Sequence, residues 1–129
     1  MSEPLVFTFT SAIKEGKLKE YEHALREAIA FIETREPRVI AFETYINDGS
    51  EATTLLVHPD AESEDFHMQV AAQTLKPLYE FVDFTKMSIA VYGRPSERVL
   101  GQMTELAQSG VTLSLKTNYV GGFNRLPAL

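Results

Sequence analysis

The sequence predicts one α+β domain with an antiparallel sheet, and three observations lead to this prediction. The chain has 129 residues, which is the size of a single domain. Strand-like and helix-like segments follow the order βαββαβ up to about residue 92, and one more helix and strand come after them. The Asp48-Gly49 pair between two strand-like segments is typical of a tight hairpin, which joins antiparallel strands.

The first four elements are expected to be a strand, a long helix and the two strands of the hairpin. Residues 5–11 are β-branched and aromatic, which favours a strand. Residues 17–36 carry apolar side chains at steps of three and four, which predicts a helix with one apolar stripe, and the charges around that stripe are typical of a solvated face. Residues 39–46 and 53–58 form the hairpin strands. The stripe consists of Leu18, Tyr21, Leu25, Ala28, Ile29 and Ile32, and the first strand is expected to place Leu5, Phe7 and Phe9 on one face.

A second helix, a short break and a fourth strand complete the core. Asp60 or Ser63 can cap a helix over about residues 61–73, where Glu62, Glu64 and Asp65 favour its positive N-terminal end. Pro77 interrupts that helix, and residues 84–92 resume the alternation of a strand. This order is that of the ferredoxin-like motif, whose antiparallel sheet carries both helices on one face.

Residues 94–129 add an α-β extension and an arm to this core. Ser96 is expected to cap a helix, and residues 111–119 alternate as a strand does. Two glycines and a proline within residues 121–129 predict an irregular arm.

Charge and composition exclude several classes of function. Twelve Lys and Arg against eighteen Asp and Glu leave a net charge of −6, which has the wrong sign for binding nucleic acid or an anionic membrane. The chain has no cysteine, which excludes disulfides, thiolate nucleophiles and iron–sulfur clusters. The first residues resemble no secretion signal, and no apolar run approaches the ~20 residues that span a bilayer. We therefore expect a cytoplasmic protein with no nucleic-acid or membrane partner.

Four short segments carry a resemblance to a known family. They are Phe42-Glu43-Thr44-Tyr45, Asp48-Gly49, Leu55-Leu56-Val57 and Ser63-Glu64-Asp65-Phe66-His67-Met68. On these segments and on the order of its elements, the chain resembles the antibiotic-biosynthesis-monooxygenase-like family, whose fold is a dimeric α+β barrel. The resemblance implies a family domain over residues 1–93, with residues 94–129 as a helix–strand extension and arm of the same domain.

The resemblance also implies a homodimer in which two sheets pack face to face. An open sheet has two faces, and the helices of this motif cover only one of them, so the other face needs a cover. On the first strand, Val6, Thr8 and Thr10 would lie on this second face and are at most weakly polar. The sequence pattern therefore supports a homodimer independently of the resemblance.

Relatives in this family include cofactor-independent oxygenases of quinols and anthrones as well as haem-degrading enzymes, and the fold does not choose among them. Haem-degrading relatives use a first-strand Asn, a Trp and a helix His, whereas this chain has no Trp and offers Thr8 and Thr10 on its first strand. We therefore expect a cofactor-independent monooxygenase that acts on a small phenolic, quinol or polyketide-like aromatic compound. The alternative is a non-catalytic dimer that binds a small molecule or serves an auxiliary role.

His67 is the first choice for the catalytic base, and Glu43 is the second. His67 lies at about the place of the family's pocket histidine, and a neutral imidazole can accept a proton from a phenol. A register shifted by one or two residues would put Met68 or Gln69 at that place, and His67 would then be structural. Glu43 can act as a base if it points into a pocket; otherwise it is an exposed or dimer-face carboxylate paired with an Arg.

The remaining candidates would bind the substrate. Thr8, Thr10 and Tyr45 are expected to form a hydrogen-bonding wall, and His58 lies at a strand end, where it can reach a pocket mouth or bond the next loop. Aromatic residues could line a cavity for a flat ligand or simply form the core. These aromatic residues are Phe66 and Tyr79, together with Tyr21, Phe81 and Tyr92.

Metal, phosphate and nucleophile motifs are missing from the sequence. His58, Asp60 and His67 match no metal-ligand spacing, so no metal site is expected. The chain also contains no Gly-rich phosphate loop and no Gly-x-Ser-x-Gly segment, which leaves hydrolase, kinase and dinucleotide-dependent functions without support.

Overall fold

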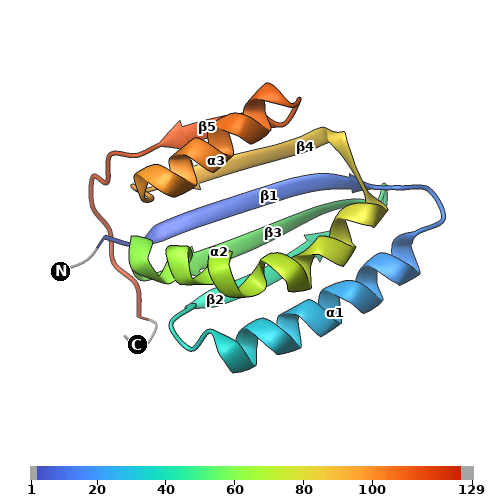
Figure 1. Cartoon of the computed structure of the whole chain (residues 1–129), viewed down its shortest axis with the longest axis horizontal. Coiled ribbons are helices and arrows are strands. Elements are labelled where there is room, and N and C mark those ends of the chain that lie inside the picture. Colours follow the sequence, from blue (N-terminus) through green and yellow to red (C-terminus); the bar gives the residue numbers. More distant parts are fainter. Residues whose placement is uncertain (1–2, 126–129) are drawn as a thin grey trace.

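An open five-stranded sheet carries all three α-helices on one face (Figure 1). The structure, a computed structural model, describes residues 3–125. Its α+β class and its ferredoxin-like core are those expected from the sequence, and the sheet of the single chain is not closed. The elements are β1 (Leu5–Ile13), α1 (Leu18–Arg35), β2 (Ala41–Ile46), β3 (Glu51–His58), α2 (Ala61–Leu75), the 3-10 helix η1 (Lys76–Phe81), β4 (Val82–Tyr92), α3 (Glu97–Gln108) and β5 (Thr112–Lys116).

The strand order is β2-β3-β1-β4-β5. The first four strands pair with one another antiparallel, and β5 pairs with β4 in parallel, with α3 as the connection. The strand expected over residues 111–119 therefore extends the sheet of its own chain, and it is shorter than expected. The sheet as a whole is mixed, while the βαββαβ core is antiparallel.

Strand register separates a helix-covered face from a helix-free face. On β1, Leu5 and Phe7 are buried under the helices, as the alternation predicted. Val6 and Thr8 point the other way, and their partners on β3 are Val57 and Leu55. No helix of the described chain covers this second face (Figure 1), which mixes apolar side chains such as Val6, Leu55 and Val57 with small polar ones such as Thr8.

The apolar stripe of α1 packs into the core as expected. Tyr21, Leu25, Ala28 and Ile32 are buried, and they recur at steps of three and four residues. The α3 extension contributes Val99 and Met103 to the buried residues of the helix-covered face. None of the helices in residues 3–125 combines the length and apolarity that crossing a membrane requires.

Gly93 joins the core to the extension at a position that only glycine can occupy. Its φ is +108°, and a Cβ added there would lie 2.7 Å from the carbonyl oxygen of Pro4. Its N–H donates to the carbonyl of Lys116 at 2.9 Å, which ties the end of β4 to the end of β5.

Asp60 is the N-cap of α2, the helix that carries His67. Its carboxylate accepts a hydrogen bond from the backbone N–H of Ser63 at 2.9 Å and an ion pair from Arg38. Burial alone would raise the pKa of the Asp60 carboxyl, but the hydrogen bonds from Ser63 and Arg38 and the charge of Arg38 together hold this pKa below its ordinary value. The first turn of α2 is therefore held by an ionised cap.

Leu25→Ala should lower the free energy of unfolding by about 2–5 kcal/mol, because it removes a buried side chain from the α1 stripe and leaves a cavity. Chemical denaturation measures this loss. Glu33→Ala, on the exposed side of the same helix, is the control and should change stability by less than about 0.5 kcal/mol. A loss well under 1 kcal/mol for Leu25→Ala would contradict its place in the core.

Asp60→Asn should lower the free energy of unfolding by an amount that depends on pH. A carboxyl whose folded-state pKa is depressed stabilises the fold above its unfolded pKa of about 3.9, and this contribution disappears as the pH falls through the folded-state value. Asn can still cap the helix, so the expected loss near pH 7 is the ion-pair contribution of up to about 1 kcal/mol. Denaturation at several pH values should therefore show the wild type and Asp60→Asn differing near pH 7 and converging as the pH falls through the folded-state pKa of Asp60.

Candidate functional site

A buried histidine–glutamate pair joins the end of β3 to the start of α2. His58 is the last residue of β3 and is 0% exposed, and its Nε2 lies 2.5 Å from Oε2 of Glu64 in the first turns of α2. Its Nδ1 lies 2.8 Å from Oγ of Ser63. Both ring nitrogens of His58 therefore have polar neighbours on one helix.

A second pair joins α2 to the end of α1. His67, on α2, places Nδ1 2.7 Å from Oε1 of Glu36, which is the C-cap residue of α1. The side chain of His67 is 5% exposed and that of Glu36 is 1% exposed. The other carboxylate oxygen of Glu36 has no hydrogen-bond partner within residues 3–125.

The two pairs form one group, called here the His–Glu cluster: Glu36, His58, Glu64 and His67. The rings of His58 and His67 lie 5.5 Å apart, between centroids, and are tilted by 56°. Phe7 of β1 meets His58 edge-on at 6.4 Å, so apolar side chains border the cluster. Nowhere in residues 3–125 are three or more His, Asp or Glu side chains arranged to hold a metal ion.

The His67–Glu36 contact has a defined chemical consequence. An ionised carboxylate only accepts hydrogen bonds, so a neutral His67 paired with it carries its hydrogen on Nδ1. Nε2 then holds the free lone pair and is the atom that can accept a proton. A carboxylate that fixes the tautomer and the orientation of an imidazole is the arrangement found in many general bases.

Four of the expected site residues lie on the opposite face of the sheet from His67. Thr8, Thr10, Glu43 and Tyr45 point to the helix-free face, because they pair in register with Leu55 or Thr53. Thr10 is hydrogen-bonded there to Thr53, at 2.9 Å between hydroxyl oxygens, and Glu43 and Tyr45 are exposed. The structure therefore brings His58 to His67 but does not bring Glu43 or the threonines to them.

The expected aromatic lining is also dispersed. Phe66 and Tyr79 are exposed, and Tyr79 packs against Phe84 with ring centroids 5.3 Å apart. Tyr21 is buried in the core under α1, where burial raises the pKa of its phenol although a hydrogen bond from Thr54 acts in the opposite direction. These side chains do not form one cavity.

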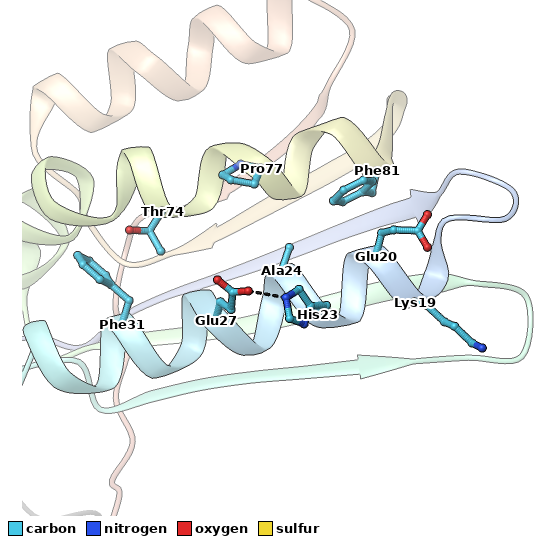
Figure 2. A pocket seen from close by; sticks show the side chains of 9 residues that line it. All are labelled: Lys19, Glu20, His23, Ala24, Glu27, Phe31, Thr74, Pro77 and Phe81. Carbon is cyan, nitrogen blue, oxygen red and sulfur yellow. Dashed lines mark ion pairs between the residues drawn. The ribbon is translucent and has the colours of Figure 1, made fainter.

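A surface groove of about 700 Å³ lies between α1 and the α2–η1 segment (Figure 2). Phe31 and Phe81 lie towards its two ends, and His23 and Glu27 of α1 form an ion pair, 2.5 Å long, at its rim. Neither this groove nor the second hollow, near the start of α1, is lined by His67 or Glu43. The groove is lined by Lys19, Glu20, His23, Ala24, Glu27, Phe31, Thr74, Pro77 and Phe81.

The sequence interpretation missed the carboxylates of the cluster. Glu36 was included among the solvated charges of the first helix, and Glu64 among the charges that favour a helix N-terminus. A signal for Glu36 was present, because it continues the buried stripe four residues after Ile32 and precedes the helix-ending Pro37. Glu64 lies three residues before His67 and so shares its side of α2.

Comparisons with known proteins bear on the fold. No family model and no curated protein matches the sequence. MupZ from Pseudomonas fluorescens is similar in structure, with a TM-score of 0.67, 15% identity and coverage of 95% of this chain and 91% of MupZ. A Caulobacter crescentus protein provisionally named an antibiotic biosynthesis monooxygenase has a TM-score of 0.64 at 10% identity, covering 74% of this chain and 92% of its own.

A variant of SnoaB, a cofactor-independent oxygenase from Streptomyces nogalater, has a TM-score of 0.60 at 10% identity and covers 74% of this chain and 96% of its own. The similarity to MupZ extends over most of the chain, while the other two cover about three quarters of it. The chain therefore has the fold of the antibiotic-biosynthesis-monooxygenase-like proteins, as the resemblance of its sequence implied.

Proposed function

We propose that the protein is a cytoplasmic, homodimeric, cofactor-independent monooxygenase that acts on a small phenolic, quinol or polyketide-like aromatic compound. The observation that carries this proposal is the buried His67–Glu36 pair, with 2.7 Å between Nδ1 and Oε1. The fold adds support, because one protein that shares it, SnoaB, is named a cofactor-independent oxygenase.

In the proposed reaction His67 is the catalytic residue and Glu36 is a positioning residue. Nε2 of His67 takes a proton from the acidic CH₂ or OH of the substrate, and the resulting anion supplies the electrons that reduce dioxygen. Carbon–oxygen bond formation gives a peroxide, which regains the proton from His67. Loss of water leaves a carbonyl group, so that CH₂ and O₂ become C=O and H₂O.

Access to Nε2 requires a movement of the helix layer. The side chain of His67 is 5% exposed, and it lines neither the groove between α1 and the α2–η1 segment nor the hollow near the start of α1. We propose that the substrate enters beside Glu36, where one carboxylate oxygen lacks a hydrogen-bond partner in the described chain and can accept a hydrogen bond from a substrate hydroxyl.

His67→Ala should lower the rate of oxygen consumption with an active quinol or anthrone by about 10²–10⁴-fold, the usual contribution of a general base. Added imidazole should restore part of this rate. Glu36→Gln should change the pH dependence of the rate without rescue by imidazole, because Glu36 acts only through His67. An oxygen electrode measures these rates, and circular dichroism checks that the variants fold.

His23→Ala is the matched control, because His23 is an exposed histidine of α1 that also contacts a glutamate. Its rate should equal that of the wild type. A His67→Ala rate within about twofold of the wild type would contradict the role of His67 and would point to Glu43 or to the acidity of the substrate itself.

A second candidate is a non-catalytic dimer that binds a small apolar molecule. The observation in its favour is the burial of His67 together with the separate groove between α1 and the α2–η1 segment, whose lining includes Phe31, Pro77 and Phe81 (Figure 2). Failure of every phenolic compound to bind either the wild type or His67→Ala would favour this candidate.

The proposed homodimer uses the helix-free face of the sheet. Val6, Leu55, Val57 and Ala90 lie on this face without helical cover, and contiguous apolar surface of this kind marks an interface. A face-to-face pairing of two sheets would remove these side chains from water.

Val6→Glu should dissociate the homodimer, because it places a charge among the apolar side chains of the helix-free face, on the middle strand of the sheet. Light scattering should report a dimer for the wild type and a monomer for the variant at micromolar concentration. Glu33→Lys, on the outer side of α1, should leave the dimer intact. A wild type that is monomeric at these concentrations would refute the dimer.

A further inference from the structure

The described part of the C-terminal arm, residues 117–125, exposes large apolar side chains to water. Val120 is 100% exposed and Phe123 is 82% exposed, which exceeds every other large hydrophobic residue in the described chain. Exposed apolar side chains gathered on a projecting segment typically mark a surface that contacts another molecule.

Contacts with the rest of the fold hold only the beginning of this arm. Gly93 donates to the carbonyl of Lys116, and Arg94 donates to Oδ1 of Asn118 at 3.1 Å. Beyond Asn118, up to residue 125, the arm has no backbone hydrogen bond with the described chain, and Figure 1 shows it leaving β5 as irregular chain. Seven extended residues can span about 23 Å, which is enough to cross several strands of a sheet.

The side chains at the end of the arm have a fixed relation to one another. The guanidinium carbon of Arg125 lies 5.1 Å from the ring centroid of Phe123. The two side chains therefore lie on the same side of the arm, as residues two apart do in extended chain. The arm thus presents an aromatic ring followed by a positive charge.

β2 presents the complementary pattern at the opposite edge of the sheet. It has β3 on one side and no strand of the described chain on the other. Tyr45 is 68% exposed, and Glu43, two residues earlier, is exposed on the same helix-free face. Glu43 forms no ion pair within residues 3–125. An edge strand of this kind is a ready site for another extended segment.

We infer that the arm of one chain pairs antiparallel with β2 of a second copy, placing Phe123 beside Tyr45 and Arg125 beside Glu43. Only the antiparallel direction allows both contacts at once. The charged residue follows the aromatic residue on the arm, whereas it precedes the aromatic residue on β2. The aromatic pair and the ion pair are both cross-strand contacts that stabilise a sheet.

The inference rests on the proposed homodimer and adds a second contact to it. The helix-free face would supply the apolar area, while the two arms would each close one unpaired edge of the partner's sheet. Loss of the arm contact would therefore weaken the dimer, whereas a charge on the helix-free face would abolish it.

Charge reversal tests the ion pair. Glu43→Arg and Arg125→Glu should each raise the dissociation constant of the dimer about three- to tenfold, because each sets like charges side by side. The double variant should recover most of the lost affinity. Glu33→Arg, Arg98→Glu and their combination are the matched controls on α1 and α3, and they should leave the constant within about twofold. Analytical ultracentrifugation measures each constant.

Disulfide cross-linking tests the register, and the absence of cysteine in the chain makes the test specific. Tyr45→Cys combined with Phe123→Cys should give a covalent dimer on a non-reducing gel, because directly opposed residues of antiparallel strands lie within disulfide distance. Tyr45→Cys combined with Asn124→Cys is the register control, because residue 124 points to the other side, and it should cross-link far less.

Three results would overturn the inference: single charge reversals without effect, a double variant that does not recover affinity, or equal cross-linking in the two cysteine pairs. If Val6→Glu dissociates the dimer but the arm variants leave its dissociation constant unchanged, the arm contact is refuted and the homodimer is not. A wild type that stays monomeric would refute both.

Discussion

The His–Glu cluster is the interaction on which the arrangement of α1, α2 and β3 depends. It connects the C-cap of α1 with the last residue of β3 through two positions on α2, all of them buried. A buried charge without its partner costs several kcal/mol, so the loss of any one member leaves the others uncompensated. The chain ends of three elements are therefore held in one geometry, and the cap of α2 at Asp60 supports the same junction from its exposed side.

The sheet divides the molecule into two faces with different chemistry. The His–Glu cluster lies on the helix-covered face, where its four side chains are buried. Side chains of moderate polarity lie on the helix-free face, and the exposed apolar arm leaves the same sheet at β5. Glu43 lies on the helix-free face. A contact at the sheet edge with another chain therefore explains its position better than a part in proton transfer with His67.

Much of the fold could be predicted because it depends on local patterns. The stripe from Tyr21 to Ile32 and the Asp48-Gly49 turn each act within a few residues, and the structure contains both as expected. The site could be predicted only in part, since the partners of His67 and His58 are set by the packing of distant elements. Glu36 is 31 residues from His67 in sequence. The direction of Glu43 depends on the pairing of β2 with β3, where a shift of one residue would reverse it.

The composition of the cluster also bears on its purpose. Replacing a buried ion pair by apolar residues of similar volume is often neutral or stabilising, so a requirement for stability alone does not explain two such pairs side by side. A single pair would tie α2 to β3, and the His58–Glu64 contact does this. Nδ1 of His58 lies within hydrogen-bond distance of Oγ of Ser63, and its Nε2 lies 2.5 Å from Oε2 of Glu64, although these last two atoms do not meet in hydrogen-bond geometry. His67 differs, because its Nδ1 is held by Glu36 while no carboxylate of the described residues forms an ion pair at its Nε2. An imidazole that is fixed at one nitrogen and has no carboxylate at the other is suited to moving a proton, and this separates His67 from His58, whose Nε2 faces Glu64.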